Sequence, residues 1–514
     1  MSIAVQNPQN SDRNLQKACV PVWMLVTGAA MAGGLGWGIR GQYGHETGAM
    51  MACLLVAMVL GLWLLPRLPS VQVIRALALA TIAGGFGGSM TYGQTLGLTQ
   101  DAPLVGNWAA WWWGILGTFL KGGLWIAFFG AFLGIGLSGK AYKPSEMAAM
   151  TVFSVFVLFL GVGIFNEPFQ PDEKLLPMIY FSDSWRWEPD SELVPRRERW
   201  GGLILVLALW LVYTLFDKKD RFPLKLAVTG FLAGGFGFAG GQCLQSFHAW
   251  NPDFLGDLNQ NINWWNFMET TFGMIWGGGM ALGLWRSRRF IAADEAVADS
   301  RNITPSPVFE WGSLIIYSLA LLVWNFGSFR YFDGFADLAW TMLMVPMVMV
   351  CVGRIWPVAF LSLVVLLPIA GKTILQMAYK TDAMSALIAW PLLGVLPLVV
   401  GVIVFFRMLR VMDFKPKASV SNVGPWAVST IILVLLYHAL NFVFFEYPWP
   451  WSPWTSRTPN EIVFLVFSAG IMIVSLWAVI RMGGALQRNA RLAQPSVPIP
   501  TSPITDTNPE NPES

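Results

Sequence analysis

The chain has 514 residues, of which 55% are hydrophobic and only 12% are charged, and its mean hydropathy is +0.54. This composition excludes an ordinary soluble globular domain and indicates an integral membrane protein. The formal net charge is only +3 and most basic residues lie in predicted loops, where they set membrane topology, so we expect no nucleic acid as a partner.

The predicted fold is an all-α polytopic membrane protein of about 14 transmembrane helices arranged as hairpin repeats. Residues 1–18 form a polar tail. A glycine-rich half, residues 19–290, then holds spans at 19–39, 48–65, 76–98, 108–138, 145–165, 200–216, 226–248 and 264–285.

A polar stretch at 291–308 is predicted to be a cytoplasmic linker to a second half, residues 309–481. That half holds spans at 309–327, 336–353, 355–371, 384–406, 424–444 and 461–480. Residues 482–514 are predicted to be a disordered tail, because the end of the chain is rich in proline and polar residues. Cytoplasmic N and C termini place most Lys and Arg inside, as the positive-inside rule requires, and a bacterial-type cytoplasmic membrane is the expected location.

A short string recurs three times in the first half: Ala32–Gly36, Ala83–Gly87 and Ala233–Gly237 all read AGG, then Leu or Phe, then Gly. A Gly-Gln pair follows each string, and similarity continues into the next predicted helix, so the repeated unit is a helical hairpin. All three strings fall on odd-numbered spans. The units therefore run parallel, from the cytoplasm outward, unlike inverted-repeat transporters.

The glycines permit two interpretations. Small residues spaced by four let helix backbones approach closely in a membrane. Alternatively, dense glycine followed by a polar pair breaks the helix and frees backbone groups to face a ligand, which is tolerated only where the backbone lines a cavity or is buried in protein.

Polar residues gather near the repeats, and they are the candidate ligand-binding or ion-coupling residues. The set comprises Arg40, Gln42, His45 and Glu46 from the first unit, Gln94 and Lys121 from the second, and Gln242, His248 and Glu269 from the third. If the hairpins pack side by side, these side chains converge on one outward-opening pocket.

Simpler roles remain open for several candidates. Glu46 and Glu269 begin predicted helices, where the helix dipole stabilises a carboxylate. Arg40 can pair with Glu46 or meet a lipid phosphate. His45, His248 and Glu46 lack the spacing of a metal site, and we expect no metal and no other cofactor.

Lys121 is the most informative single residue. It lies about 20 Å along the helix from Trp108, near the middle of a long span. An ammonium at that depth costs about 2.5–3.5 kcal/mol, so it must face a cavity, a carboxylate or carbonyls freed by glycine, unless the helix kinks and the side chain snorkels.

The favoured function is a permease or secondary transporter for a small hydrophilic solute, including an anionic one. Glu46 and Glu269 would carry a coupling proton or cation, and Arg40 and Lys121 would suit an anionic group. The alternative is a membrane-embedded transferase or hydrolase acting on a lipid-linked or periplasmic substrate, with His45 and Glu46 as general base and partner. A channel or a membrane scaffold is also open. The expected partners are the bilayer, the solute and the coupling ion, and a homo-oligomer is compatible with this reading.

Overall fold

The computed structural model describes residues 20–39, 45–293, 366, 369–412 and 419–493. Within these ranges every regular element is a helix, and the only β-type pairing is an isolated bridge between Gln170 and Leu175. The predicted linker from 294 onward, the spans at 309–327 and 336–353 and most of 355–371 lie outside the described residues.

The first half contains nine α-helices. They are α2 (Val22–Ile39), α3 (His45–Leu64), α4 (Ser70–Gly87), α5 (Gly93–Gln100), α6 (Trp108–Leu137), α7 (Pro144–Phe165), α8 (Trp200–Val212), α9 (Phe222–Trp250) and α10 (Trp264–Arg286). The described C-terminal part adds α16 (Ala386–Ala389), α17 (Leu396–Val411), α18 (Val423–Phe444) and α19 (Thr458–Ala493).

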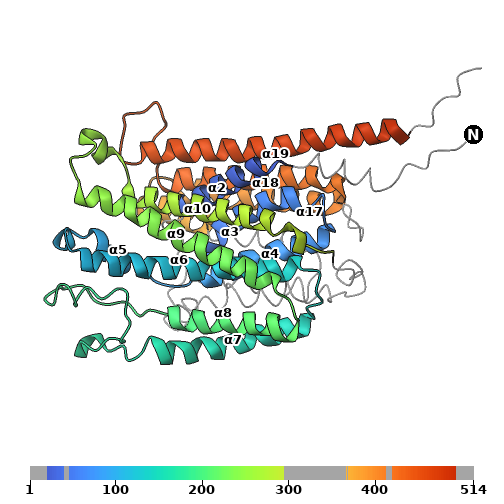
Figure 1. The fold of residues 1–514 in the computed structure, drawn as a ribbon. Coiled ribbons are helices and arrows are strands. Elements are labelled where there is room, and N and C mark those ends of the chain that lie inside the picture. Colours follow the sequence, from blue (N-terminus) through green and yellow to red (C-terminus); the bar gives the residue numbers. More distant parts are fainter. Residues whose placement is uncertain (1–19, 40–44, 294–365, 367–368, 413–418, 494–514) are drawn as a thin grey trace, which may run out of the picture.

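Six of these helices form a closed ring. Going round it, α2 packs on α3, α3 on α4, α4 on α6, α6 on α9, α9 on α10, and α10 on α2 again. The ring therefore consists of the three hairpins that the sequence repeat marks, namely α2–α3, α4–α6 and α9–α10, each lying between the other two. α8 packs on α6, α7 on α8, and α18 and α19 pack outside the ring on α3 and α2 (Figure 1).

Glycines make the closest interfaces of the ring. A Cβ on Gly234 of α9 would run into the backbone carbonyl of Gly122 on α6, and one on Gly122 would meet the carbonyl of Gly234. Gly33 of α2 and Gly273 of α10 exclude each other's Cβ in the same reciprocal way. The packing interpretation of the repeated glycines is therefore confirmed at both interfaces.

Large aromatic side chains fill the centre of the ring. Trp37 of α2 and Trp125 of α6 come from helices that lie opposite one another in the ring order, yet their ring centroids are only 4.1 Å apart. Phe272 of α10 contacts both tryptophans, and Phe238 of α9 stacks on Phe272 at 4.6 Å. The middle of the ring is thus a packed aromatic core.

Nine described helices are long and apolar enough to span a membrane, and a shorter apolar stretch lies in α3. α10 is long enough but is not among the nine. Peripheral helices expose large apolar side chains, as α7 does with Phe153, Phe156 and Leu160, which suits contact with lipid. The described chain is thus that of an α-helical, multi-pass membrane protein.

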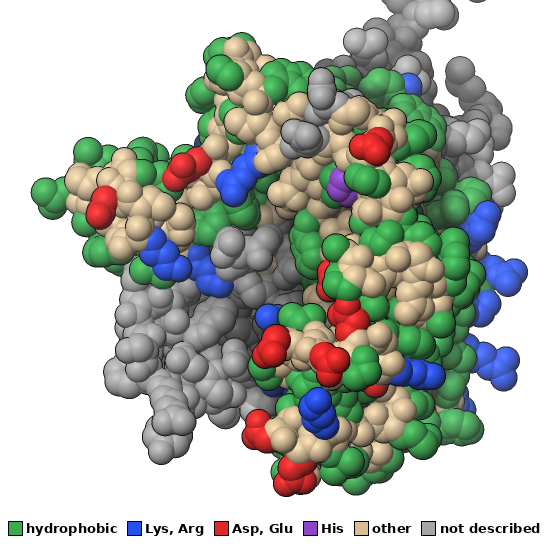
Figure 2. Space-filling view, turned by 90° about the vertical axis from the view of Figure 1, so that its left-hand side faces the viewer, with side chains coloured by type: hydrophobic (Ala, Val, Ile, Leu, Met, Phe, Trp, Pro, Cys, Tyr) green, Lys and Arg blue, Asp and Glu red, His purple; other side chains and the backbone are tan. Residues whose placement is uncertain are grey.

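The α7–α8, α9–α10 and α18–α19 connections lie at the same end of the molecule as α5, on the left in Figure 1. Viewed onto this end, acidic and basic side chains are gathered on the surface among the polar loops, with hydrophobic side chains at the rim (Figure 2). The predicted topology places these four segments together on the outer side, and we call this the loop end.

Three sequence-based expectations need correction. The predicted span 76–98 is two helices, because α4 stops at Gly87 and α5 starts at Gly93. The string at Ala233 does not break its helix, since α9 runs without interruption from Phe222 to Trp250. The tail predicted to be disordered from 482 is helical as far as Ala493, because α19 continues through Gly483 and Gly484 into a stretch of good helix formers such as Ala, Leu, Gln and Arg.

Candidate functional site

The break between α4 and α5 is where most of the described candidate residues meet. Gly88 ends α4, and the chain is not helical again until Gly93. The break leaves the carbonyl of Thr91 available to a side chain, as the helix-breaking interpretation of this repeat predicted. In the third unit α9 stays helical well past its AGG string, and in the first unit residues 40–44 after α2 lie outside the described part of the chain.

Lys121 forms a buried ion pair with Glu198, the acid two residues before α8. Its Nζ lies 2.6 Å from Glu198 Oε1, and the two side chains are 2% and 1% exposed. Nζ also donates to the carbonyl of Thr91 at 2.9 Å and to Thr95 Oγ1 at 2.7 Å. All three ammonium protons of Lys121 therefore have acceptors.

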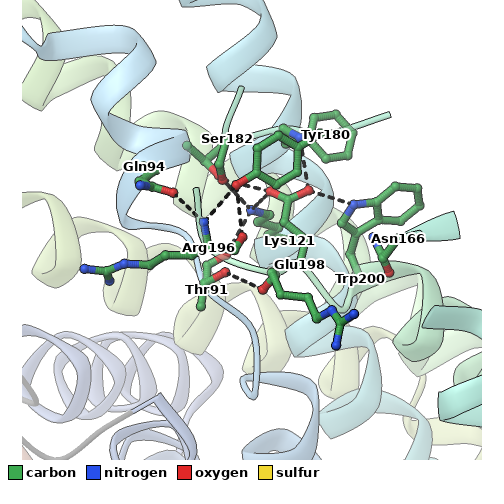
Figure 3. A network of polar contacts seen from close by, with 12 residues as sticks. Thr91, Gln94, Lys121, Asn166, Tyr180, Ser182, Arg196, Glu198 and Trp200 are labelled. Carbon is green, nitrogen blue, oxygen red and sulfur yellow. Dashed lines mark hydrogen bonds and ion pairs between the residues drawn. The ribbon is translucent and has the colours of Figure 1, made fainter. Parts of the chain in front are cut away.

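Glu198 is held just as fully. Its Oε1 accepts from Ser182 Oγ at 2.8 Å, and its Oε2 accepts from the amide of Phe181 and from Trp200 Nε1, both at 3.0 Å (Figure 3). A buried ion pair with every donor and acceptor satisfied is the arrangement that low-dielectric surroundings require. The pair fixes the 166–199 loop onto α6, and we interpret it as structural.

The pair also changes the expected depth of Lys121. α8 and the π-helical turn that follows it, residues 200–217, make one candidate span. Because Glu198 precedes that span, Lys121 lies level with its beginning and not with its middle. Lys121 therefore has the two kinds of partner that were predicted for it, a carboxylate and a carbonyl freed from a helix. It lies toward the loop end of the molecule, however, and not at the predicted midpoint of a span.

Gln94 belongs to the same network. Its amide donates to the carbonyl of Val194 at 2.7 Å and accepts from the amide of Arg196 at 3.1 Å. Tyr180 exchanges two further hydrogen bonds with the Arg196 backbone, and burial, with the charge of Glu198 adding to it, raises the pKa of the Tyr180 phenol. Gln94 therefore anchors a loop, and Figure 3 shows it pointing at Arg196.

Gln242 and His248 lie along α9. Gln242 is fully buried and donates to Thr99 Oγ1 of α5 at 2.6 Å, while its Oε1 has no hydrogen-bond partner within the described ranges. His248 stacks on Trp264 with centroids 4.5 Å apart. Gln242 thus helps to hold α5 against α9. The His248 side chain packs against the first residue of α10, away from the α4–α5 break.

Glu269 lies inside the ring of six helices. Its side chain is fully buried on α10, one turn from Phe272, and its Oε1 accepts a hydrogen bond from Tyr92 Oη at 3.0 Å. Tyr92 comes from the α4–α5 break, and its ring contacts both Trp37 and Phe238. The carboxylate therefore lies beside the aromatic core, inside the ring of six helices.

The remaining candidates cannot be placed. Arg40 and Gln42 lie outside the described residues, and α3 begins at His45, but the side chains of His45 and Glu46 are likewise outside the described part. Of the five candidates that can be placed, Gln94 belongs to residues 91–99, and Lys121, Gln242 and Glu269 all form hydrogen bonds to that segment. They meet at one segment, and each of the four binds protein groups. Among the described residues no group of acids, histidines and cysteines is arranged to hold a metal ion.

Sequence reasoning missed three acidic or basic groups of interest. Glu198 is one of eight acids in the 166–199 loop, and nothing local distinguishes it. Glu461 follows Thr458 by three residues at the start of a helix, and this spacing is typical of a capping box. In the structure Glu461 instead binds His438 of α18.

Comparisons with protein-family models, with curated proteins and with solved structures gave no match. The case for a function therefore depends on the geometry alone.

Proposed function

We propose that the protein is a secondary transporter of a small hydrophilic solute, with Glu269 as an ion-carrying carboxylate. The observation that carries this proposal is the position of Glu269: fully buried, on a transmembrane-length hairpin, beside the centre of a closed ring of helices. Ionisable side chains inside a membrane domain are costly, and they typically mark solute or ion pathways.

The chemistry at Glu269 supports reversible ion binding. Tyr92 donates a hydrogen bond from its neutral phenol to the Glu269 carboxylate at 3.0 Å, and a hydroxyl can also accept a hydrogen bond when the carboxyl is protonated. A carboxylate stabilised by a phenol can take up a proton and release it again at moderate cost, as coupling to a proton gradient requires.

The aromatic core supports a closed state of the pathway. Trp37 and Trp125 meet across the ring, with centroids 4.1 Å apart. A solute that passes between these two side chains has to separate them. Opposing aromatic side chains that part and meet again are a simple gate, and Glu269 lies one turn from Phe272, which contacts Trp125.

The structure changes which solutes the proposal favours. Lys121 was a candidate residue for binding an anionic group of the solute, but Glu198 already balances its charge. Only Arg40 still argues for an anion, and it lies outside the described residues. We therefore propose a hydrophilic solute without fixing its charge, carried across a bacterial-type cytoplasmic membrane. The rival enzyme hypothesis depends on His45 and Glu46, whose side chains are not described.

A flux assay in proteoliposomes tests the proposal. Vesicles loaded with the pH-sensitive dye pyranine receive amino acids, monosaccharides and small carboxylates one at a time outside, with and without a pH gradient. We expect one class to change the internal pH, and E269Q to abolish the change. E173Q, in the exposed 166–199 loop, is the matched control and keeps it. If no solute moves under any ion gradient, the protein is not a secondary transporter.

A further inference from the structure

A second buried carboxylate lies outside the ring, between α18 and α19. Glu461 Oε1 is 2.9 Å from His438 Nε2, and the other ring nitrogen, Nδ1, is 3.1 Å from Ser468 Oγ. Glu461 is 1% exposed, His438 13% and Ser468 4%. The three side chains thus form one continuous hydrogen-bonded row across the helix pair.

This row accommodates two protonation states of the imidazole. In the neutral ring Nε2–H donates to Glu461, and Nδ1 accepts from the Ser468 hydroxyl. In the protonated ring Nδ1–H donates, and the same hydroxyl turns and accepts, because a serine can do either. Both hydrogen bonds survive the gain or loss of a proton, so the exchange requires no rearrangement of the helices.

The two buried carboxylates, Glu198 and Glu461, differ in how their oxygens are held. Glu198 has a partner for each oxygen and faces a lysine. Glu461 Oε2 is buried, and it has no hydrogen-bond partner in the part of the chain that is described. Its only described partner is the one side chain type that titrates near neutral pH. The two pairs therefore differ in the partner of the carboxylate, which is a lysine in the first pair and an imidazole with two ring nitrogens in the second.

The same residue types also occur in serine hydrolases, but the backbone here argues against a nucleophile. Ser468 lies in the middle of the continuous helix α19, where backbone amides are bonded to carbonyls four residues earlier. No pair of amides is then free to stabilise an oxyanion, which acyl transfer needs. Ser468 consequently serves to orient the imidazole.

The α18–α19 connection places further charged and phenolic groups near this row, namely Glu446, Arg457 and the buried Tyr447. Burial raises the pKa of the Tyr447 phenol, and the negative charges of Glu461 and Glu269 both raise it further, while Arg457 lowers it.

Among the described side chains, the other ionisable groups on the packed elements lie elsewhere. Tyr437 of α18 donates its hydroxyl to the carbonyl of Gly36. The arginine side chains of α17 and α19 that the structure describes lie toward the far ends of these helices; they are Arg407, Arg410 and Arg481. The side chains of His45 and Glu46 on α3 are outside the described part. Glu461 is in the first turn of α19, beside the connection from α18, so the loop end is the nearer end of the molecule.

We infer that His438 and Glu461, oriented by Ser468, bind a proton that enters from the loop end and couples solute movement to the proton gradient. The coupling part of this inference rests on the transport function proposed above. The proton site itself stands on the hydrogen-bond geometry.

Nitrogen NMR of the imidazoles tests the proton site directly. The chain has only three histidines, so ¹⁵N-histidine labelling gives three rings, and H438Q assigns the one of interest. We expect the ¹⁵N shifts of the His438 ring to show that the ring gains a proton reversibly when the pH is lowered within the range in which the protein stays folded. In E461Q the pH response of this ring should differ from that of the wild type, because the anionic partner is gone.

S468A and E446Q complete the comparison. S468A removes the partner of Nδ1 in both protonation states, so it should change the pH response of the ring less than E461Q does. E446Q changes an exposed acid of the neighbouring connection and should leave the pH response unchanged. The proton site is refuted if the wild-type His438 ring keeps one protonation state over the whole range, or if E461Q titrates like the wild type. The wild-type titration requires no variant to fold.

Flux measurements then test the coupling. With the solute found in the pyranine screen, H438Q should still exchange internal for external solute, but it should no longer accumulate solute against its gradient when a pH gradient is imposed. Accumulation at wild-type level in H438Q would overturn the coupling role. If the wild type moves no solute, the proposed function fails, while the NMR titration still decides whether the proton site exists.

Discussion

The buried residues Lys121 and Glu198 show how much one ion pair can constrain. Lys121 stood out in the sequence as a charge within a long apolar run, and physical reasoning correctly required a partner for it. The identity of that partner was beyond local pattern, because Glu198 is 77 positions away in an acid-containing loop. Which acid pairs with Lys121 depends on how distant segments pack together. The residues next to Lys121 or Glu198 in the sequence do not specify that packing.

Removal of one member of this pair should be costly. K121M leaves the Glu198 charge buried without its cation, and we expect the free energy of unfolding in detergent to fall by about 3–5 kcal/mol. The double variant K121M/E198Q should recover much of this loss, because no charge then remains buried. Denaturant titration followed by tryptophan fluorescence measures both.

An exposed pair provides the control. Lys143 and Glu146 are 3.6 Å apart, and the lysine side chain is 74% exposed. K143M should therefore lose less than about 1 kcal/mol. Equal losses in K121M and K143M would show that the Lys121–Glu198 pair is not buried as described.

At the scale of the helix, the hydrophobic pattern located most elements well. Predicted spans at 108–138 and 264–285 agree with α6 and α10 to within one residue at each end. The pattern failed at 76–98, where an apolar run continues across the gap between α4 and α5. Hydropathy alone does not separate a helix from a turn when the turn is built from Gly88, Ser89 and Met90.

Helix contacts through glycine should not tolerate even a methyl group. G234A places a Cβ against the carbonyl of Gly122, and we expect the α6–α9 interface to lose about 1–3 kcal/mol through overpacking. Gly163 of α7 has open space at its Cβ, so G163A should be neutral or slightly stabilising, since alanine favours helix. Thermal unfolding of the purified variants in one detergent compares them. A similar loss in both would contradict the reciprocal glycine contact.

The short helix α5 gives a pH dependence with a definite sign. Asp101 is its C-cap, where a negative charge opposes the helix dipole, and burial together with the charge of Glu188 raises the pKa of the carboxyl. The folded state then holds its proton to higher pH than the unfolded state, so this group costs stability above its folded pKa and nothing below its unfolded value near 3.9.

D101N should accordingly stabilise the protein at pH 7.5 by about 0.3–1 kcal/mol, a gain that disappears toward pH 4. Melting temperatures of wild type and variant across this range provide the measurement. A gain that grows on acidification would mean that the sign is wrong.

For the whole molecule, the sequence repeat anticipated hairpins but not how they associate. Similarity between segments shows that they adopt similar structures, whereas the order round the ring depends on which faces fit together. The candidate residues illustrate the difference. Their gathering near residues 91–99 was foreseeable from three parallel hairpins, but whether each side chain meets a ligand or another protein group depends on loops such as 166–199.

Labelling from one side of the membrane tests the arrangement of the loops. Cysteines introduced at Glu173, Asp253 and Ser456, in a background where the four natural cysteines are replaced by serine, should all react with an impermeant maleimide from one side. Cysteines at Lys140 and Arg288 should react only after the membrane is opened. Reaction of the first three from different sides would rule out a common loop end.

Because the ring closes within one polypeptide, its three hairpins need not remain alike at the axis. Directly after the AGG string, the first unit has Trp37 and the third has Phe238, while the second has Gly88. Three separate identical hairpins would bring three like side chains to the same level. A ring built from one chain has no such symmetry requirement, so one hairpin can carry Glu269 while the other two supply Trp37 and Trp125.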